Sequence, residues 1–264
     1  MKKTTKIKNP DSRRQYILDY MMKNKAADIS QLSKLLDVSE MTVRRDLNIL
    51  EKSDQLLRVH GGARIMPKEM HEKPLIKRMA EHSKAKMLIG RYAAGLVEEG
   101  DVIVLDASST AYAMCHFLDV SIVVITSNLS IALVMAEKPN IDVILLGGKL
   151  RKSSLSTVGS DLSYMMEKYH ADKAFISAKS VNLKRGLTDV TSEEGESKKA
   201  MLASCSKAYL LLDHSKLDTN AFYTVCGLND TMELITDHTD TLKENQKQFL
   251  LDCDQLGVKV HIVD

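Results

Sequence analysis

The feature that most constrains this chain is the segment from Ser39 to Leu50, which has the pattern of a short helix with one buried face. Val43, Leu47 and Leu50 are spaced i, i+4 and i+7, so they form one apolar stripe of a helix with about 3.6 residues per turn. Ser39 is a suitable N-cap, because its hydroxyl can accept a hydrogen bond from an unpaired backbone N–H at the helix start. The polar residues left on or beside the opposite face are Thr42, Arg44, Arg45 and Asn48. This is the design of a recognition helix, whose N-terminal half enters the major groove of DNA.

Two further helical patterns precede this segment. Residues 12–23 place aromatic and apolar side chains at helical spacing, with Asp11 or Ser12 as the expected N-cap. A second helix is expected from about Ser30, and residues 37–38 are expected to form a turn into the next helix. Three helices with a tight turn before the arginine-bearing one predict a helix-turn-helix.

The segment that follows the expected recognition helix, Gln55 to Arg64, predicts a wing. A short extended run leads into Gly61 and Gly62, and paired glycines allow a close approach of the backbone. Cationic side chains on either side of the glycines can contact phosphates or the edge of the minor groove. The residues of this wing that we expect at the DNA are Arg58, His60, Gly61, Gly62 and Arg64.

The charge is distributed unevenly along the chain. Residues 1–64 hold 14 Lys and Arg against 8 Asp and Glu, whereas the remainder holds 23 against 27, so the first part is +6 and the rest −4. This asymmetry favours a basic nucleic-acid module joined to a near-neutral globular one. A solvated basic face is the alternative, and charge alone does not separate the two.

A second domain is expected over residues 83–264, after a helix-turn-helix domain at 1–64 and a linker at 65–82 that contains two prolines and many charges. In this domain short apolar runs alternate with helical patterns. The runs are 102–105, 122–125, 143–146, 174–176, 209–212, 234–235 and 258–263, and the helical patterns are 83–98, 110–117, 128–137, 161–170, 194–205 and 240–255. The alternation predicts an open, mostly parallel α/β sheet covered on both faces.

Polar residues or glycines follow most of the expected strands, and in such a sheet the ligand crevice lies outside the carboxyl ends of the strands. Ser108, Ser109 and Thr110 open an expected helix, where free N–H groups and the helix dipole favour an anion such as phosphate. Lys149, Arg151 and Lys216 add positive charge, and Asp106, Asn128 and Asp213 offer partners for hydroxyl groups. This combination suits a phosphorylated sugar.

Several classes of protein are disfavoured by what the sequence lacks. It contains neither a Walker P-loop nor a GxGxxG segment, which counts against an NTPase and a dinucleotide enzyme. It has no apolar run near the roughly 18 residues of a membrane span and no apolar segment behind the basic start, so we expect no membrane partner and a cytoplasmic location. The four cysteines form no CxxC, and His60 and His214 lack partners at metal-ligand spacing, so we expect free, mostly buried thiols, no metal and no cofactor.

The motifs resemble those of the DeoR family of bacterial transcriptional regulators over almost the whole chain. In the first domain VSEMTVRRDLNIL followed by LLRVHGGA matches the family's signature. In the second, LDASSTA, ITSNLSIA, ILLGGKLR, VGSDL, GLTDVTSEEGESKKAM and LLLDHSKL occur in the order of the family's sensor domain. The resemblance implies a sensor fold similar to the ribose-5-phosphate isomerase and CoA-transferase superfamily, and an effector that is a phosphorylated sugar or a related metabolite.

The resemblance also implies an effector pocket. Two departures from the family pattern affect this pocket. Ser108 replaces a glycine of the first loop, and the family's glycine-bearing FIG segment reads FISAKS here, with Ser177 and Ser180. The Cβ atoms that these serines add are expected to narrow the phosphate loop. The pocket implied is Asp106, Ser109, Thr110, Asn128, Gly147, Gly148, Lys149, Arg151, Asp213 and Lys216, together with Ser108 and with Glu194, Glu196 and Lys198 nearby.

The hypothesis is therefore a DNA-binding regulator without catalytic residues that acts as a homo-oligomer (dimer or tetramer) on double-stranded operator DNA. Repression is the leading form of this hypothesis, and activation, which depends on the position of the operator, stays open. An alternative from another class is a sugar-phosphate isomerase with a DNA-binding appendage, in which Asp106 or Glu194 would act as a base. For Glu194 a structural interpretation is equally open, because Thr191 and Glu194 fit a capping box and Glu194 with Lys198 forms an i, i+4 pair.

Overall fold

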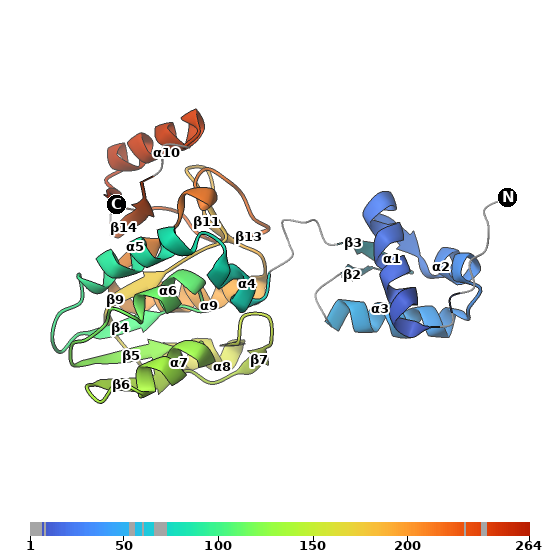
Figure 1. Ribbon diagram of the computed structural model, residues 1–264, viewed down its shortest axis with the longest axis horizontal. Coiled ribbons are helices and arrows are strands. Elements are labelled where there is room, and N and C mark those ends of the chain that lie inside the picture. Colours follow the sequence, from blue (N-terminus) through green and yellow to red (C-terminus); the bar gives the residue numbers. More distant parts are fainter. Residues whose placement is uncertain are drawn as a thin grey trace. The chain divides into compact units, whose positions relative to one another are not determined.

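The computed structural model describes residues 7, 9–52, 56–59, 61–65, 73–229, 231–238 and 242–264. The chain divides into two compact units, Met1–Glu72 and Lys73–Asp264, which we call the N-terminal and C-terminal units and describe separately (Figure 1). Within the stretch expected to be a linker, residues 66–72 lie outside the described part, while Leu75–Ala80 forms helix α4. Leu75 is buried and its N–H donates to the carbonyl of Ser153 at 2.9 Å, so this helix packs on the C-terminal unit.

The N-terminal unit contains the three predicted helices and a small antiparallel sheet. The helices are α1 (Pro10–Asn24), α2 (Ile29–Leu36) and α3 (Glu40–Lys52), and the strands β1 (Ala26–Asp28), β2 (Leu56–Val59) and β3 (Gly62–Ile65) lie in the order β1-β3-β2. The expected N-cap of α1 was wrong. The cap is Asn9, whose side chain accepts from the N–H groups of Asp11 and Ser12, because Pro10 with its fixed φ already occupies the first helical turn.

The predicted apolar stripe of α3 forms the centre of the N-terminal core. Val43, Leu47 and Leu50 are buried and pack with Ile17 of α1 and Leu32 of α2. The side of α3 that carries the arginines is thereby turned away from the core.

The C-terminal unit is built on a seven-stranded sheet in which every neighbouring pair is parallel, with the order β15-β14-β12-β9-β4-β5-β6 (Figure 1). Each of the seven predicted apolar runs contributes one strand, which confirms the open parallel α/β fold. The strands are β4 (Val102–Leu105), β5 (Ile122–Thr126), β6 (Ile141–Leu145), β9 (Ala171–Ile176), β12 (Cys205–Leu211), β14 (Met232–Asp237) and β15 (Lys259–Val263).

Helices cover both faces of this sheet, as the continuous apolar runs require. The helices α5 (Ser83–Ala94), α6 (Ser109–Met114) and α7 (Leu129–Ala136) contribute to one apolar cluster with residues such as Phe175 and Tyr209, whose rings stack at 5.1 Å. The other face is covered by α8 (Ser160–Met166), α9 (Ser192–Ala203) and α10 (Glu244–Gln255). Because all seven strands run parallel, their carboxyl ends lie at one edge of the sheet.

Shorter elements beside that edge were not predicted. They are the hairpin β7 (Lys149–Arg151) and β8 (Ser156–Val158), the antiparallel sheet of β10 (Ser180–Asn182), β11 (Gly186–Asp189) and β13 (Tyr223–Cys226), and the 3₁₀ turn η2 (His214–Lys216). Strands of three or four residues with many polar side chains show no usable periodicity.

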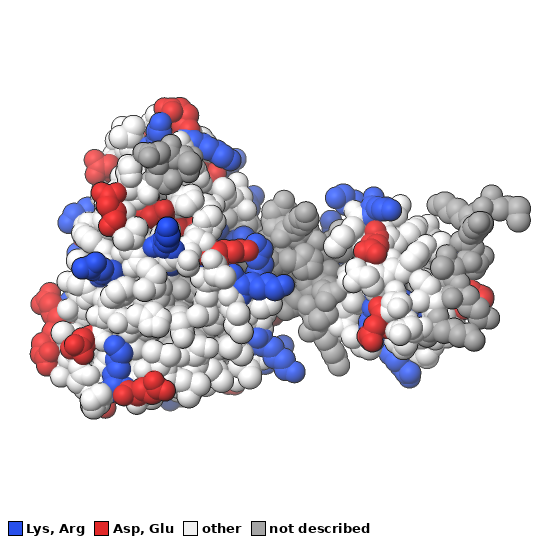
Figure 2. Space-filling view, in the orientation of Figure 1, with Lys and Arg blue, Asp and Glu red and all other residues white. Residues whose placement is uncertain are grey.

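The surface shown in Figure 2 carries Lys and Arg interspersed with Asp and Glu over the C-terminal unit, in keeping with its near-neutral composition. In the part of the chain that the structure describes, none of the helices combines the length and apolar character needed to cross a bilayer.

Candidate functional site

Helix α3 presents the two arginines of its exposed face as the sequence predicted. The hydroxyl of Ser39 accepts from the backbone N–H of Thr42 at 3.2 Å, which is the expected N-cap. Arg44 and Arg45 are exposed, as is Asn48, whereas Thr42 is half-buried. The first turns of the helix therefore offer polar side chains that point away from the core.

The acidic residues near these arginines do not neutralise both of them. Asp46 is buried and binds Arg13 of α1 through two hydrogen bonds, so it is not the solvent-exposed partner that the alternative of a solvated face requires. Arg44 lies 3.7 Å from Glu40, an exposed pair that contributes little energy. The side chain of Arg45 is exposed, and it forms neither a hydrogen bond nor an ion pair with the side chain of another described residue.

The predicted wing is the hairpin of β2 and β3, and its first strand is tied to α3. Arg58 donates through Nη1 to Oδ1 of Asn48 at 2.6 Å, so two residues predicted to contact DNA also contact each other. Arg64 is exposed on β3, and His60 lies outside the described residues.

Glycine is needed at the two glycine positions of the wing for different structural reasons. Gly61 has a φ of +80°, a conformation that favours glycine. At Gly62 an added Cβ would lie 2.4 Å from the carbonyl oxygen of Ala27 in the neighbouring strand β1, so this position needs glycine for close approach of the two strands.

In the C-terminal unit, Asp106 follows β4 at the sheet edge where the strands end. It is fully buried, and its carboxylate accepts from the N–H of Ser108 at 3.2 Å and from the N–H of Ser177 at 3.0 Å. Burial raises the pKa of this carboxyl, against the opposing effect of Lys198, whose Nζ lies 3.5 Å away.

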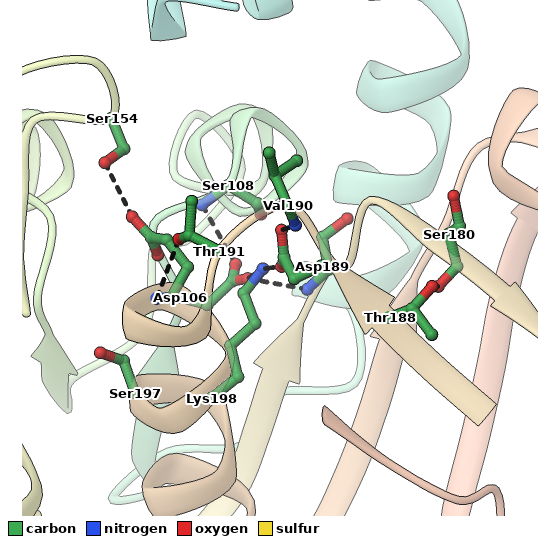
Figure 3. Close-up of polar contacts among 12 residues, drawn as sticks. Asp106, Ser108, Ser154, Ser180, Thr188, Asp189, Val190, Thr191, Ser197 and Lys198 are labelled. Atoms are coloured by element: carbon green, nitrogen blue, oxygen red, sulfur yellow. Dashed lines mark hydrogen bonds and ion pairs between the residues drawn. The ribbon is translucent and has the colours of Figure 1, made fainter. Parts of the chain in front are cut away.

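Lys198 points from α9 into the same place and joins two carboxylates (Figure 3). It donates a hydrogen bond to Asp189, the last residue of β11, and both side chains are buried. Burial alone would lower the pKa of Lys198 and raise the pKa of Asp189. The attraction between the two charges outweighs burial, so the pKa of Lys198 is raised and that of Asp189 is lowered. The three charges form a buried cluster with two negative groups and one positive group.

Glu194, one turn earlier on α9, faces a different set of partners. Its Oε1 accepts hydrogen bonds from the hydroxyls of Ser154 and Ser156, each at 2.7 Å, and lies 3.7 Å from Arg151. The hydroxyl of Thr191 caps α9 by accepting from the N–H of Glu194, which is one half of the predicted capping box. The side chain of Glu194 supplies no second half, because it binds Ser154 and Ser156. The predicted pairing of Glu194 with Lys198 was wrong, because Lys198 pairs with Asp189 and Asp106 instead.

Two of the candidate residues are used to cap helices. The hydroxyl of Ser108 accepts from the N–H of Ala111 at 3.0 Å, and Oδ1 of Asn128 accepts from the N–H of Ile131 at 3.0 Å. Ser109 and Thr110 are buried beside the first cap, and Oγ1 of Thr110 has no hydrogen-bond partner among the described residues. Thr110 therefore has an unused polar atom near the carboxyl end of β4.

Lys216 and Asp213 lie on the loop after β12. Nζ of Lys216 donates to the hydroxyl of Ser177 at 2.7 Å, and that hydroxyl in turn donates to the carbonyl of Leu211. Burial lowers the pKa of Lys216 to about 8. The pKa of Asp213 is lowered because the attraction of Lys216 and the hydrogen bonds from Ser215 outweigh the effect of burial. The hydroxyl of Ser177 thus connects Lys216 to the backbone at the end of β12.

The structure does not bring every candidate into this cluster. Lys149 is exposed on β7 and pairs with Val158 of β8. Gly148 has a φ of +138°, and a Cβ there would lie 2.7 Å from the carbonyl oxygen of Val158, so its glycine is explained by the hairpin. Gly147 donates its N–H to the sulfur of Met165. Glu196 is exposed and pairs with Lys199.

Three residues that bind these candidates were missed by the sequence analysis. They are Asp189, which binds Lys198, and Ser154 and Ser156, which bind Glu194. Asp189 is the last residue of the four-residue strand β11, which is too short to be recognised from the sequence, so the fold was needed to find it. The two serines lie in and before the unpredicted strand β8, where no sequence pattern marks them.

Two regions of the chain match known protein families. Residues 13–69 match the family described as the DeoR-like helix-turn-helix domain, and residues 81–238 match the DeoR C terminal sensor domain.

Full-length relatives show the same relationship. The chain is 38% identical over 224 residues to the HTH-type transcriptional repressor GlcR of Bacillus subtilis, which covers 84% of this chain and 86% of that protein. It is 35% identical over 231 residues to the HTH-type transcriptional regulator GolR of Listeria innocua, covering 87% and 91%. It is 32% identical over 216 residues to the lactose phosphotransferase system repressor of Staphylococcus aureus, covering 79% and 84%. These relatives are named as transcriptional regulators or repressors, and none of the three is named as an isomerase.

Among solved structures, ribose 5-phosphate isomerase A of Methanocaldococcus jannaschii matches with a TM-score of 0.39 and 19% identity, over 52% of this chain and 55% of that chain.

Proposed function

Because this chain belongs to the DeoR family of transcriptional regulators, we propose that it represses genes of carbohydrate metabolism and that a small phosphorylated sugar or related metabolite modulates its affinity for operator DNA. The observation that carries the proposal is the pairing of two features in one chain. Helix α3 exposes Arg44 and Arg45, and the edge of the parallel sheet gathers the buried Asp106 and Lys198 and the half-buried Lys216. Relatives named as a repressor of a lactose phosphotransferase system and as GlcR support the sugar-related role.

The proposed DNA contacts are made by α3 and by the wing. Side chains near the start of α3 are expected to reach base edges, whereas cations of the wing are expected to contact phosphates, which fix position rather than sequence. The hydrogen bond between Asn48 and Arg58 supports this arrangement, because it holds the wing strand against the exposed face of the helix. The proposed contacts are Ser39, Thr42, Arg44, Arg45, Asn48, Arg58, His60, Gly61, Gly62 and Arg64.

The proposed effector site is the polar edge of the sheet. The buried Lys198 and the half-buried Lys216 supply positive charge for a phosphate or a hydroxyl. The carboxylates and the free hydroxyl of Thr110 supply partners for sugar hydroxyl groups. The residues proposed at this site are Asp106, Ser108, Ser109, Thr110, Asn128, Gly147, Gly148, Lys149, Arg151, Glu194, Lys198, Asp213 and Lys216.

We further propose that the chain works as a homo-oligomer on a palindromic operator, since two recognition helices about one helical turn of DNA apart bind two half-sites. An effector then releases the DNA if it binds more tightly to a subunit arrangement that does not fit the half-site spacing. Coupling of about 1 to 3 kcal/mol, or roughly 5- to 150-fold in affinity, is typical of such linkage.

The deciding experiment measures binding of the full chain to DNA from upstream of its own gene, by fluorescence anisotropy at one fixed salt concentration, during titration with a panel of sugar phosphates. We expect one compound to weaken DNA binding and the matching unphosphorylated sugar to have less effect. Lys216→Ala should bind the DNA as before and lose the response to that compound. Failure to bind any fragment of that DNA would contradict the regulatory role, and an unchanged response in Lys216→Ala would remove this lysine from the site.

A further inference from the structure

A cluster of potential metal ligands adjoins the proposed effector site and shares Asp213 with it, whereas its two histidines have no place in the proposed function. His82, Asp213 and His214 each offer one ligand atom, and these three atoms lie within 4.8 Å of one another. The sequence separates His82 from the other two by about 130 residues, which explains why spacing along the chain did not reveal the cluster. Folding brings them together because His82 lies between α4 and α5, while the pair 213–214 follows β12.

His214 is held in the orientation that metal-binding histidines adopt. Its backbone N–H contacts Oδ1 of Asp237 at 2.8 Å, and its ring Nδ1 contacts Oδ2 of the same carboxylate at 2.7 Å. Asp237 is buried at the end of β14. A histidine that donates one ring N–H to a carboxylate presents the other nitrogen, here Nε2, as a ligand with fixed tautomer and raised basicity.

The other two ligands are also available. Oδ1 of Asp213 accepts both hydrogen bonds from Ser215, and Oδ2 accepts none from a described residue. The ring of His82 meets the ring of His214 edge-on, with centroids 4.9 Å apart. His82 is exposed and has a left-handed backbone conformation, so its side chain reaches the cluster from the surface.

Two lysines lie close to this cluster and set a limit on its affinity. Lys86 and Lys216 both act electrostatically on Asp213, and a bound cation would be repelled by them. Their ammonium groups, however, donate to neutral oxygens, Lys86 to the carbonyls of Arg78 and Glu81 and Lys216 to the hydroxyl of Ser177. Neither forms an ion pair with Asp213 among the described residues, so Oδ2 of this buried carboxylate is not already occupied by either lysine.

We propose that His82, Asp213 and His214 bind a divalent transition-metal ion, with Zn²⁺ the best fit, and that Asp237 supports the site by orienting His214. Two imidazoles and one carboxylate suit Zn²⁺ and its neighbours, whereas Mg²⁺ and Ca²⁺ prefer oxygen ligands alone. Bond lengths of about 2.0 to 2.2 Å to a tetrahedral ion place ligand atoms about 3.3 to 3.5 Å apart, so the side chains need to close inward by only about 1 Å. The bound ion joins the turn between α4 and α5 to the end of β12.

The test uses the full chain without a histidine tag, stripped of metal with a chelator and then titrated with Zn²⁺ by calorimetry and with Co²⁺ by visible absorption. We expect one ion per chain, a Co²⁺ spectrum of tetrahedral type, a rise in Tm with Zn²⁺ and no such rise with Mg²⁺. His82→Asn removes one imidazole and keeps a residue that tolerates the left-handed backbone. We expect this variant to lose the Tm shift, and Asp237→Asn to bind Zn²⁺ about 10- to 100-fold more weakly.

His238→Gln is the matched control, because His238 is an exposed histidine 3.5 Å from the carboxylate of Asp264 that belongs to no such cluster among the described residues. It should bind Zn²⁺ as the unaltered chain does. The proposal is overturned if the unaltered chain binds no more Zn²⁺ than the double variant His82→Asn and His214→Gln, or if His238→Gln lowers binding as much as His82→Asn. Folding of each variant is checked by circular dichroism in chelator. The readouts are metal binding and Tm, and they are measured without DNA and without an effector.

Discussion

The guanidinium of Arg13 on α1 binds the carboxylate of Asp46 on α3, with Nε 2.5 Å from Oδ2 and Nη2 3.2 Å from Oδ1. Both side chains are buried, so this pair joins α1 to α3 within the core of the N-terminal unit. A buried charge that loses its partner is strongly destabilising, whereas replacement of both partners by apolar residues is often tolerated.

We therefore expect Asp46→Ala to destabilise the N-terminal unit by about 3 to 5 kcal/mol and to abolish DNA binding through unfolding. The double variant Arg13→Met and Asp46→Leu should recover most of that stability. Hydrogen exchange of the amides of α1 and α3 in the full chain measures both effects. Asp11→Ala is the control, since Asp11 forms an exposed pair with Arg14 that contributes at most about 1 kcal/mol. Equal effects of Asp11→Ala and Asp46→Ala would contradict the role of the buried pair.

Replacement of the exposed arginines of α3 should affect DNA binding and leave the folding of the chain unchanged. Arg44→Ala and Arg45→Ala should each weaken operator binding, and a residue that contacts a base edge should also relax specificity by about 1 to 3 kcal/mol. A residue that contacts only phosphate should instead reduce the salt dependence of binding by about one unit of slope. Anisotropy measurements on operator and mismatched DNA over a range of salt separate these cases. Lys259→Ala, the same charge change on an exposed residue of the C-terminal unit, should alter neither quantity. Unchanged binding in both arginine variants would exclude α3 as the recognition helix.

The sequence predicted the structural elements that have long, regular patterns and missed those with short ones. The stripe of Val43, Leu47 and Leu50 and the seven apolar runs of the sheet were long enough to identify the elements, because burial of one face enforces a regular period. Long-range pairing was not predictable. The partners of Lys198 and of His214 come from distant segments, and short polar strands such as β8 and β11 carry no periodic signal. Position after a strand found Asp106 and Lys216, and the fold was needed to find Asp189.

The two glycines of the wing should respond differently to alanine. At Gly61 the open surroundings leave only the cost of the left-handed backbone, about 1 to 2 kcal/mol. At Gly62 the new Cβ would meet the backbone of Ala27, which is unable to move without disturbing the pairing of β1 with β3, so we expect a larger loss. Thermal unfolding of the two variants compares these costs, and Gly61→Asn, which tolerates the left-handed region, should recover part of the stability. A Gly62→Ala variant as stable as the unaltered chain would show that β1 does not lie against β3.

Adjacent lysines on α9 provide a matched test of the buried charge cluster. Lys198→Met leaves Asp189 and Asp106 buried without their cation, and we expect a loss of about 3 to 5 kcal/mol at neutral pH. Lys199→Met removes a partly exposed lysine that pairs with Glu196, and we expect a change within about 1 kcal/mol. The free energy of unfolding of the C-terminal unit in urea measures both. Comparable losses in the two variants would contradict the assignment of Lys198 as the cation that holds the cluster together.

The pKa of Asp189 predicts how this cluster responds to acid. The folded chain lowers that pKa, because the attraction and hydrogen bond of Lys198 outweigh burial. A carboxyl whose folded pKa lies below its unfolded value near 3.9 stabilises the fold above that value, and the contribution is lost as the pH falls through the folded pKa. Asp189→Asn should therefore be less stable than the unaltered chain at pH 7, and the difference should shrink below about pH 4. Unfolding in urea at several pH values measures the difference, with Asp254→Asn, at an exposed position of α10, as the control. A difference that stays constant down to pH 3 would show that Asp189 is not held ionised by Lys198.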